Sequence, residues 1–168
     1  MKKGRINNKG QMSLSFGMIF GIFLIVIFIA FAFYAIQKFL QLKDTTQIAK
    51  FADDLQSDID KIWKGSQGSQ EKAYILPVGI DLVCFIDYNS GTGSGEVYDE
   101  LEQFFLGNEN LFFYPSGSGE GLDSKETKHI NVEKITETEN PFCIENERGR
   151  VTLILKKDFG EALVRIEK

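Results

Sequence analysis

The hydrophobic residues of the chain are concentrated near its beginning. Residues 10–37 include no charged side chain, and fourteen of the positions from Phe16 to Ile36 are Phe, Ile, Leu or Val. A helix needs about 20 consecutive apolar residues to cross the hydrocarbon core of a bilayer. A buried core helix is the alternative, but the other residues are too few and too polar to enclose an apolar helix of this length. We therefore expect a membrane-spanning helix over residues 11–37.

Beyond the span the hydrophobic pattern continues as a single stripe, which predicts an amphipathic stem over residues 38–64. Positions three or four residues apart share one helix face. The stripe consists of Thr45, Ile48, Ala52, Leu55, Ile59 and Ile62. We expect it to pack on the protein's own sheet; a self-associating coiled coil is the alternative, although fewer than three heptads are present. Residues 65–72 are rich in Gly, Ser and Gln and predict a flexible linker.

From residue 73 the pattern changes to the alternation typical of strands, and residues 73–168 are expected to form one domain. An edge strand or lead-in is predicted at 74–78, strands at 80–88, 111–114 and 129–135, a short helix near 97–105, and a polar loop at 116–128. Strands at 142–145, 150–156 and 161–166 predict an antiparallel meander. The expected fold class is therefore α+β, with a long N-terminal membrane helix extended into a stem that packs on an antiparallel sheet.

The two cysteines, Cys84 and Cys143, lie in two of the predicted strands. In an oxidising exterior they could form a disulfide, worth about 4 kcal/mol in the chain-entropy model. Two buried free thiols are the alternative. A metal site is not expected, because the cysteines are distant in sequence and His129 is the only histidine.

The distribution of charge predicts an orientation. The four basic residues Lys2, Lys3, Arg5 and Lys9 precede the apolar stretch, and the residues after them include 15 basic and 24 acidic side chains, a net charge of −9. Basic residues beside a span mark its cytoplasmic end. We expect a single-pass protein of the cell membrane, with a cytoplasmic N-terminus and an acidic extracytoplasmic domain. Such a domain is a poor partner for nucleic acid.

No residue pattern in the domain predicts catalysis. The glycines of residues 91–95 and 117–119 lack the spacing of phosphate-binding loops, and His129 has no second histidine or nucleophile motif to work with. We therefore expect no enzyme active site, no cofactor and no small-molecule substrate.

The junction between the basic leader and the apolar stretch, residues 9–16, is KGQMSLSF. It resembles the class III signal peptide of archaeal type IV prepilins and archaellins, over about the first forty residues of the chain. The resemblance implies that a prepilin peptidase removes residues 1–10 by cleaving between Gly10 and Gln11. Gln11 and Ser13 match the family's Gln-x-Ser-x-Glu pattern, whereas Ser15 replaces its Glu. In type IV pilins that Glu is thought to neutralise the N-terminal amine of a neighbouring subunit, which a hydroxyl cannot do.

The resemblance also implies a pilin-like architecture and a function. The chain would be a membrane-anchored structural or cell-surface subunit that contributes to a filament or surface complex. Its partners would be the lipid bilayer, the prepilin peptidase, and other copies of itself or other pilin subunits. Three alternatives stay open: an uncleaved single-pass protein with a partner-binding outer domain, a secretory signal peptide cleaved near residues 30–32, and a membrane-tethered enzyme with an unrecognised site.

Overall fold

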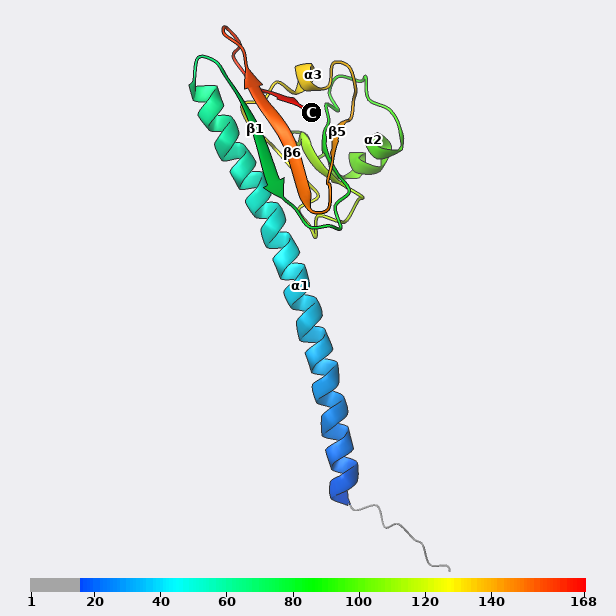
Figure 1. The fold of residues 1–168 in the computed structure, drawn as a ribbon. Coiled ribbons are helices and arrows are strands. Elements are labelled where there is room, and N and C mark those ends of the chain that lie inside the picture. Colours follow the sequence, from blue (N-terminus) through cyan, green and yellow to red (C-terminus); the bar gives the residue numbers. More distant parts are fainter. Residues whose placement is uncertain (1–15) are drawn as a thin grey trace, which may run out of the picture. The chain divides into compact units, whose positions relative to one another are not determined.

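The computed structural model of the chain describes residues 16–168. The chain divides into two units, Met1–Phe39 and Leu40–Lys168. Helix α1, Phe16–Lys64, is an uninterrupted helix of 49 residues that begins in the first unit and ends in the second (Figure 1).

The described part of the first unit is the apolar beginning of α1, residues 16–39. Its large hydrophobic side chains are all exposed, from 39% for Leu24 to 83% for Phe16. Among the described residues, α1 is the one helix long and apolar enough to cross a membrane. This stretch coincides with the membrane-spanning helix expected from the sequence.

The second unit consists of the stem, residues 40–64 of α1, and of residues 65–168, which we call the head. One sheet of the head has the strand order β1–β6–β7, with bounds Gly68–Ile75, Arg150–Lys157 and Arg165–Glu167. The other has the order β4–β3–β2–β5, with bounds Ser124–Lys125, Leu111–Tyr114, Leu82–Phe85 and Phe142–Glu145. All these neighbours are antiparallel. The helices α2 (Glu96–Leu101), η1 (Glu102–Phe104, a 3-10 turn) and α3 (Val132–Ile135) lie in the connections, so the expected α+β class is confirmed.

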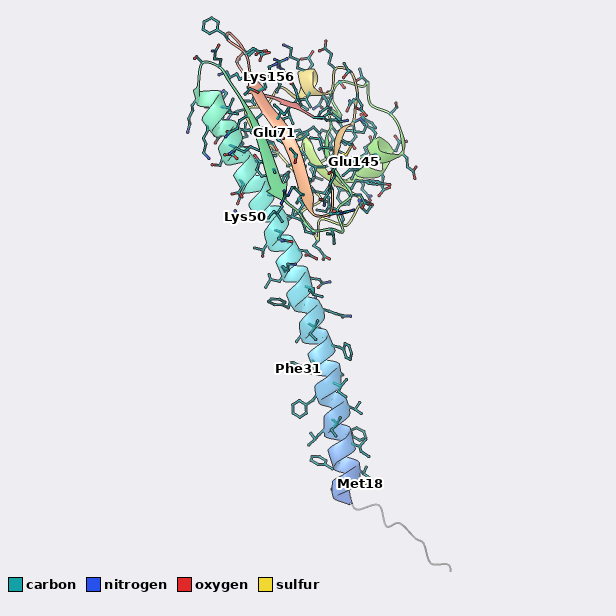
Figure 2. All side chains as sticks on the ribbon, viewed as in Figure 1. Met18, Phe31, Lys50, Glu71, Glu145 and Lys156 are labelled. Atoms are coloured by element: carbon teal, nitrogen blue, oxygen red, sulfur yellow. A yellow bond between two sulfur atoms is a disulfide. The ribbon has the colours of Figure 1, made fainter. Side chains whose placement is uncertain are left out.

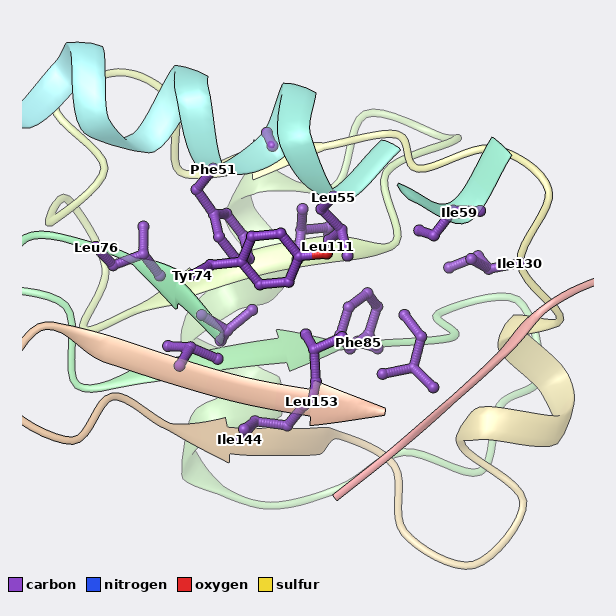
Figure 3. Close-up of a cluster of buried hydrophobic side chains, with 14 of the residues drawn as sticks. Phe51, Leu55, Ile59, Tyr74, Leu76, Phe85, Leu111, Ile130, Ile144 and Leu153 are labelled. Atoms are coloured by element: carbon purple, nitrogen blue, oxygen red, sulfur yellow. The ribbon is translucent and has the colours of Figure 1, made fainter. Parts of the chain in front are cut away.

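One hydrophobic core joins the stem to both sheets. Phe51 of the stem meets Tyr74 of β1 edge to face, with ring centroids 5.3 Å apart, and meets Phe113 of β3 at 5.8 Å. Leu55 and Ile59 are fully buried in the same cluster (Figure 3). The stem is therefore part of the head's core, and does not form the coiled coil named as the alternative.

The linker expected at residues 65–72 was wrong, because Gly68–Ile75 is the edge strand β1. All eight of its residues are in register with β6, from Gly68 opposite Lys157 to Ile75 opposite Arg150. Gly is depleted in strands, and Ser and Gln are not among the residues enriched there, but backbone pairing with β6 and the burial of Tyr74 outweigh this preference.

The expected strand at 129–135 was also wrong. Ile130 makes a single parallel bridge to Val164, and residues 132–135 form the short helix α3. Asn131 caps this helix, since its side chain accepts a hydrogen bond from the backbone N–H of Lys134 at 3.0 Å. The cap gives the backbone a local alternative to a strand.

The C-terminal meander is only partly present. β6 and β7 pair as expected, but β5 joins β2 in the other sheet, so the turn at residues 146–149 carries the chain between sheets. The strand expected at 80–88 is limited to β2, Leu82–Phe85, and the loop at 116–128 includes the short strand β4. The four consecutive residues from Val83 to Ile86 are all buried, so both faces of this strand are covered. The alternation of buried and exposed residues on which the prediction relied is therefore absent from β2.

Candidate functional site

The exposed apolar surface of residues 16–39 is the first candidate site. Phe31 and Phe39 are about two-thirds exposed, at 67% and 68%, and Met18 is 58% exposed. Figure 2 shows the side chains of this stretch standing away from the helix on several sides, with Met18 and Phe31 labelled. Apolar surface costs about 25 cal/mol per Å² to leave in water. A helix that is apolar on all sides therefore needs a bilayer or neighbouring protein around it.

The predicted cleavage and junction residues Gly10, Gln11, Ser13 and Ser15 lie outside the described residues. The description begins at Phe16, the first residue of α1.

The stem stripe is the second candidate site. The structure buries Ile48, Ala52, Leu55 and Ile59, and packs the half-buried Ile62 against the same core. Phe51 and Asp58 are also buried, although the sequence stripe did not include them. Phe51 could have been found, because it is three residues after Ile48 and four before Leu55. Nothing in the sequence marks Asp58 as buried, because its partners come together only in the fold.

Asp58 sits at the centre of a charged contact between the stem and β1. Its carboxylate accepts hydrogen bonds from Lys61 Nζ at 2.8 Å and from the Tyr74 hydroxyl at 3.1 Å, and Lys72 Nζ lies 3.5 Å away. Burial alone raises the pKa of Asp58, but the hydrogen bonds and lysine charges outweigh it and lower this pKa below its ordinary value. Burial and the Asp58 charge raise the pKa of Tyr74. The contact therefore requires an ionised Asp58 and a neutral Tyr74.

Two further contacts hold the C-terminal end of the stem. The buried ammonium of Lys157 on β6 donates to the carbonyl oxygens of Trp63 and Gly65, at 2.7 and 2.9 Å. The Trp63 carbonyl is among those that a helix end leaves without an intrahelical partner, and Gly65 follows directly after the helix. His129 stacks on Trp63 and its Nδ1 lies 2.8 Å from Asp60 Oδ1. That hydrogen bond is the main reason why the pKa of Asp60 is lowered.

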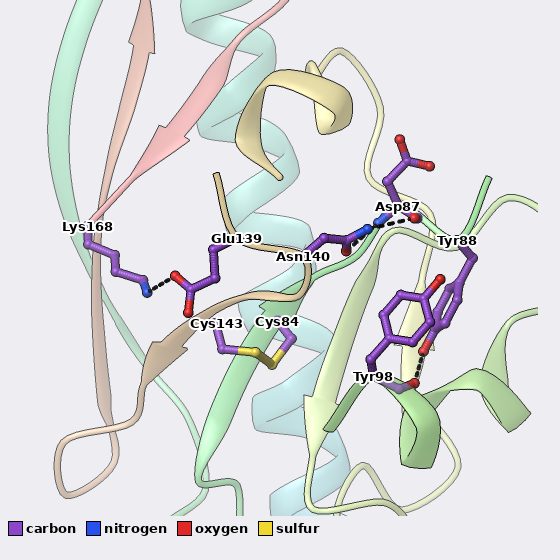
Figure 4. Close-up of a disulfide and its surroundings, with 8 residues drawn as sticks. All are labelled: Cys84, Asp87, Tyr88, Tyr98, Glu139, Asn140, Cys143 and Lys168. Atoms are coloured by element: carbon purple, nitrogen blue, oxygen red, sulfur yellow. Dashed lines mark hydrogen bonds and ion pairs between the residues drawn. A yellow bond between two sulfur atoms is a disulfide. The ribbon is translucent and has the colours of Figure 1, made fainter. Parts of the chain in front are cut away.

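Cys84 on β2 and Cys143 on β5 are direct cross-strand partners and form a disulfide (Figure 4). The bond therefore lies within one sheet and does not connect it to the β6–β7 hairpin, as the expected meander would have required. Nearby, the Asn140 side chain donates to the carbonyl of Asp87 at 2.9 Å and accepts from its backbone N–H at 3.3 Å. These contacts fix the loops on either side of the disulfide.

Two hollows of the head have charged side chains on their walls. One of about 350 Å³ is lined by Cys143, Arg150 and Lys168, with acidic residues beside them. Another of about 470 Å³ has Asp87, Glu133 and Glu137 on its walls. Among residues 16–168, no three His, Cys, Asp or Glu side chains are placed to hold a metal ion.

Comparisons with models of known protein families, with curated proteins and with solved structures found no match to this chain.

Proposed function

We propose that the chain is a membrane-anchored, pilin-like structural subunit that a prepilin peptidase cleaves between Gly10 and Gln11. The observation that carries the proposal is the change along α1 from an exposed apolar surface to a buried stripe. Residues 16–39 are apolar and exposed, whereas residues 48–59 of the same helix are built into the core of a head. Such a helix can lie in a bilayer or in a bundle of identical helices, while its other part holds a folded domain.

We also propose a location for the subunit. The subunit crosses the cell membrane once, with Lys2, Lys3, Arg5 and Lys9 in the cytoplasm and the head outside, and it contributes to a surface filament or complex. The Cys84–Cys143 disulfide supports an extracytoplasmic head, because disulfides persist in oxidising compartments. The role is structural, and the head's contacts with other subunits take the place of a catalytic site.

A second candidate function is an uncleaved single-pass membrane protein whose outer head binds a partner. Ser15 favours it, because this residue stands where pilins have the Glu that pairs with a neighbouring N-terminus. A serine hydroxyl cannot supply that negative charge, which suits a chain that stays in the membrane as a single subunit.

A processing variant with a matched control separates the two functions. Gly10→Leu places a bulky residue before the expected cleavage point, whereas Gly4→Leu makes the same change elsewhere in the leader. In cells with an active prepilin peptidase, the native chain and Gly4→Leu should reach the sheared surface fraction, and Gly10→Leu should keep its leader and remain in the membrane. If all three chains keep their leaders and stay in the membrane, the second function is correct.

A further inference from the structure

Phe159 is an exposed aromatic residue at the turn between β6 and β7. Its side chain is 83% exposed, although every other phenylalanine of the head is buried or half-buried. Aromatic side chains that fill a pocket of the partner are common anchor residues in protein–protein interfaces, so an anchor role for Phe159 requires a pocket that can receive it.

The turn that presents Phe159 is held in place by hydrogen bonds and ion pairs. The backbone N–H of Asp158 donates to the Glu161 carboxylate at 2.8 Å, and the N–H of Glu161 returns a bond to the Asp158 carbonyl at 3.1 Å. Arg165 contacts both carboxylates, and Lys157 ties the start of the turn to the end of α1. A preorganised anchor loses little conformational entropy on binding.

An apolar groove lies between the stem and the free edge of β1, with a volume of about 390 Å³. Its lining includes Phe51, Ala73, Tyr74 and Ile75, with Lys50 and Asp54 at the rim. Ile75 is 66% exposed at the groove's lip, so apolar surface there remains uncovered. We call this hollow the stem groove.

The Phe159 turn and the stem groove lie at opposite ends of the second unit. Lys157 binds the carbonyl of Trp63, whereas the groove begins near Lys50, thirteen residues earlier on the same helix. At 1.5 Å per residue the two levels differ by about 20 Å along the stem. In Figure 2, Lys156 lies at the end of β6 next to the turn, whereas Lys50 lies on the stem near the other end of β1.

The charges beside the two surfaces are complementary. Lys156 lies three residues before Phe159, and Lys50 and Asp54 line the groove, so Lys156 of one copy can face Asp54 of a second copy. The pairs of Lys156 within its own chain are long, at 3.8 and 3.9 Å, and the Lys50–Asp54 pair is exposed, so exchanging them costs little. Asp158 stays paired with Arg165.

We propose that Phe159 of one copy inserts into the stem groove of a second copy. Anchor and groove are different surfaces at opposite ends, so the contact is heterologous and can repeat without closing, which is the geometry of a filament. This inference rests on the proposed filament function and adds to it the surface through which one head meets the next.

The direct test is a photo-crosslinking amino acid at position 159 of the full chain, with position 106 as the control. Leu106 is equally exposed, at 86%, but lies on another turn. Membranes and sheared surface material from the same cells are irradiated, and the linked peptides are identified by mass spectrometry. We expect position 159, and not position 106, to link to the peptides of residues 47–54 or 73–75 of a second copy, in the sheared material.

The outcomes separate this inference from the proposed function. Sheared filaments with no link from position 159 to the groove, or with a link to a different protein, overturn the inference and leave the filament function standing. Absence of both filaments and links overturns both. Phe159→Ser gives a second readout: it should lower the yield of sheared filaments at least about tenfold, whereas Leu106→Ser should not.

Discussion

The imidazole of His129 lies parallel to the indole of Trp63, with ring centroids 3.7 Å apart and planes inclined by 5°. One ring belongs to the end of the stem and the other to the head, and Asp60 on the stem bonds the imidazole as well. These contacts hold the end of the stem against the head, at the end opposite the stem groove. Trp63 is the chain's only tryptophan, so the fluorescence of the protein reports on this contact between stem and head.

Two substitutions of His129 should separate the contribution of the stacked ring from that of the hydrogen bond to Asp60. His129→Ala removes the stacked ring and the bond to Asp60, and should lower the free energy of unfolding by about 1–2 kcal/mol. His129→Phe keeps a ring but not the hydrogen bond, and should lose about half as much. Both variants keep the left-handed backbone at this position, φ 65°, so its strain affects them equally.

The measurement is Trp63 emission during urea unfolding of the full chain in detergent. His129→Ala should also change the emission of the folded protein, because the indole loses its neighbour. Native-like emission and stability in His129→Ala would mean that the stacked pair does not help to hold the stem against the head.

Lys157 should contribute more to the free energy of unfolding than Lys156, its neighbour on the same strand. Lys157→Met keeps the apolar chain but leaves the carbonyls of Trp63 and Gly65 without their charged donor, which should cost about 2 kcal/mol. Lys156→Met removes only long, exposed contacts of 3.8–3.9 Å and should cost less than about 0.5 kcal/mol. Equal thermal stability of the two variants would contradict this reading of the helix end.

Substitution of Gly93 should lower the free energy of unfolding, because this residue lies against the ring of Tyr98. A Cβ there would be 1.8 Å from Tyr98 Cε2, so the ring would have to leave its contact with Tyr88, now at 4.5 Å between centroids. Gly93→Ala should lower stability by about 1–3 kcal/mol. Gly79 is the matched control, since a Cβ there meets nothing within 4 Å and Gly79→Ala should be neutral or slightly stabilising. Thermal unfolding of both variants decides the point.

Strongly alkaline pH should weaken the head. Burial is the main cause that raises the pKa of both Tyr74 and Tyr88, with the Asp58 charge adding to it for Tyr74. Their contribution is therefore complete below pH 10, where unfolded tyrosine is neutral, and falls as the pH rises from there toward the folded-state pKa values.

The check is urea unfolding at several pH values from about 8 to 11. Native protein should lose stability above pH 10, and the double variant Tyr74→Phe/Tyr88→Phe should lose less over the same range. The double variant will be less stable at pH 8, because Asp58 loses a donor and the Tyr88 hydroxyl no longer bonds the Tyr98 carbonyl. An identical pH slope in both proteins would show that these tyrosines do not govern the alkaline limit.

Much of the fold could be predicted where one physical effect dominates. The apolar stretch and the stem stripe at Ile48, Leu55 and Ile59 follow from helical periodicity and burial alone. β3 was predicted with its observed bounds, Leu111–Tyr114, because a short apolar run ends at Pro115. The cysteine pair needed little further information, since two cysteines allow only one intramolecular pairing.

The rest depends on contacts between distant residues. Gly68 to Lys72 form a strand only because β6 offers a partner, and nothing local indicates it. β5 belongs with β2 because Cys143 lies opposite Cys84, a relationship between residues 59 positions apart. The stem contacts of Lys157 and His129 likewise join segments that are far apart in sequence, so a pattern search along the chain does not find them.

We propose above all the removal of a leader, residues 1–10, before the helix and head join a surface structure. Its most direct test is the intact mass of the chain recovered from sheared surface material of cells with an active prepilin peptidase. We expect a single species that starts at Gln11 and retains the Cys84–Cys143 bond. A chain that still begins at Met1, recovered only from the membrane, would contradict it.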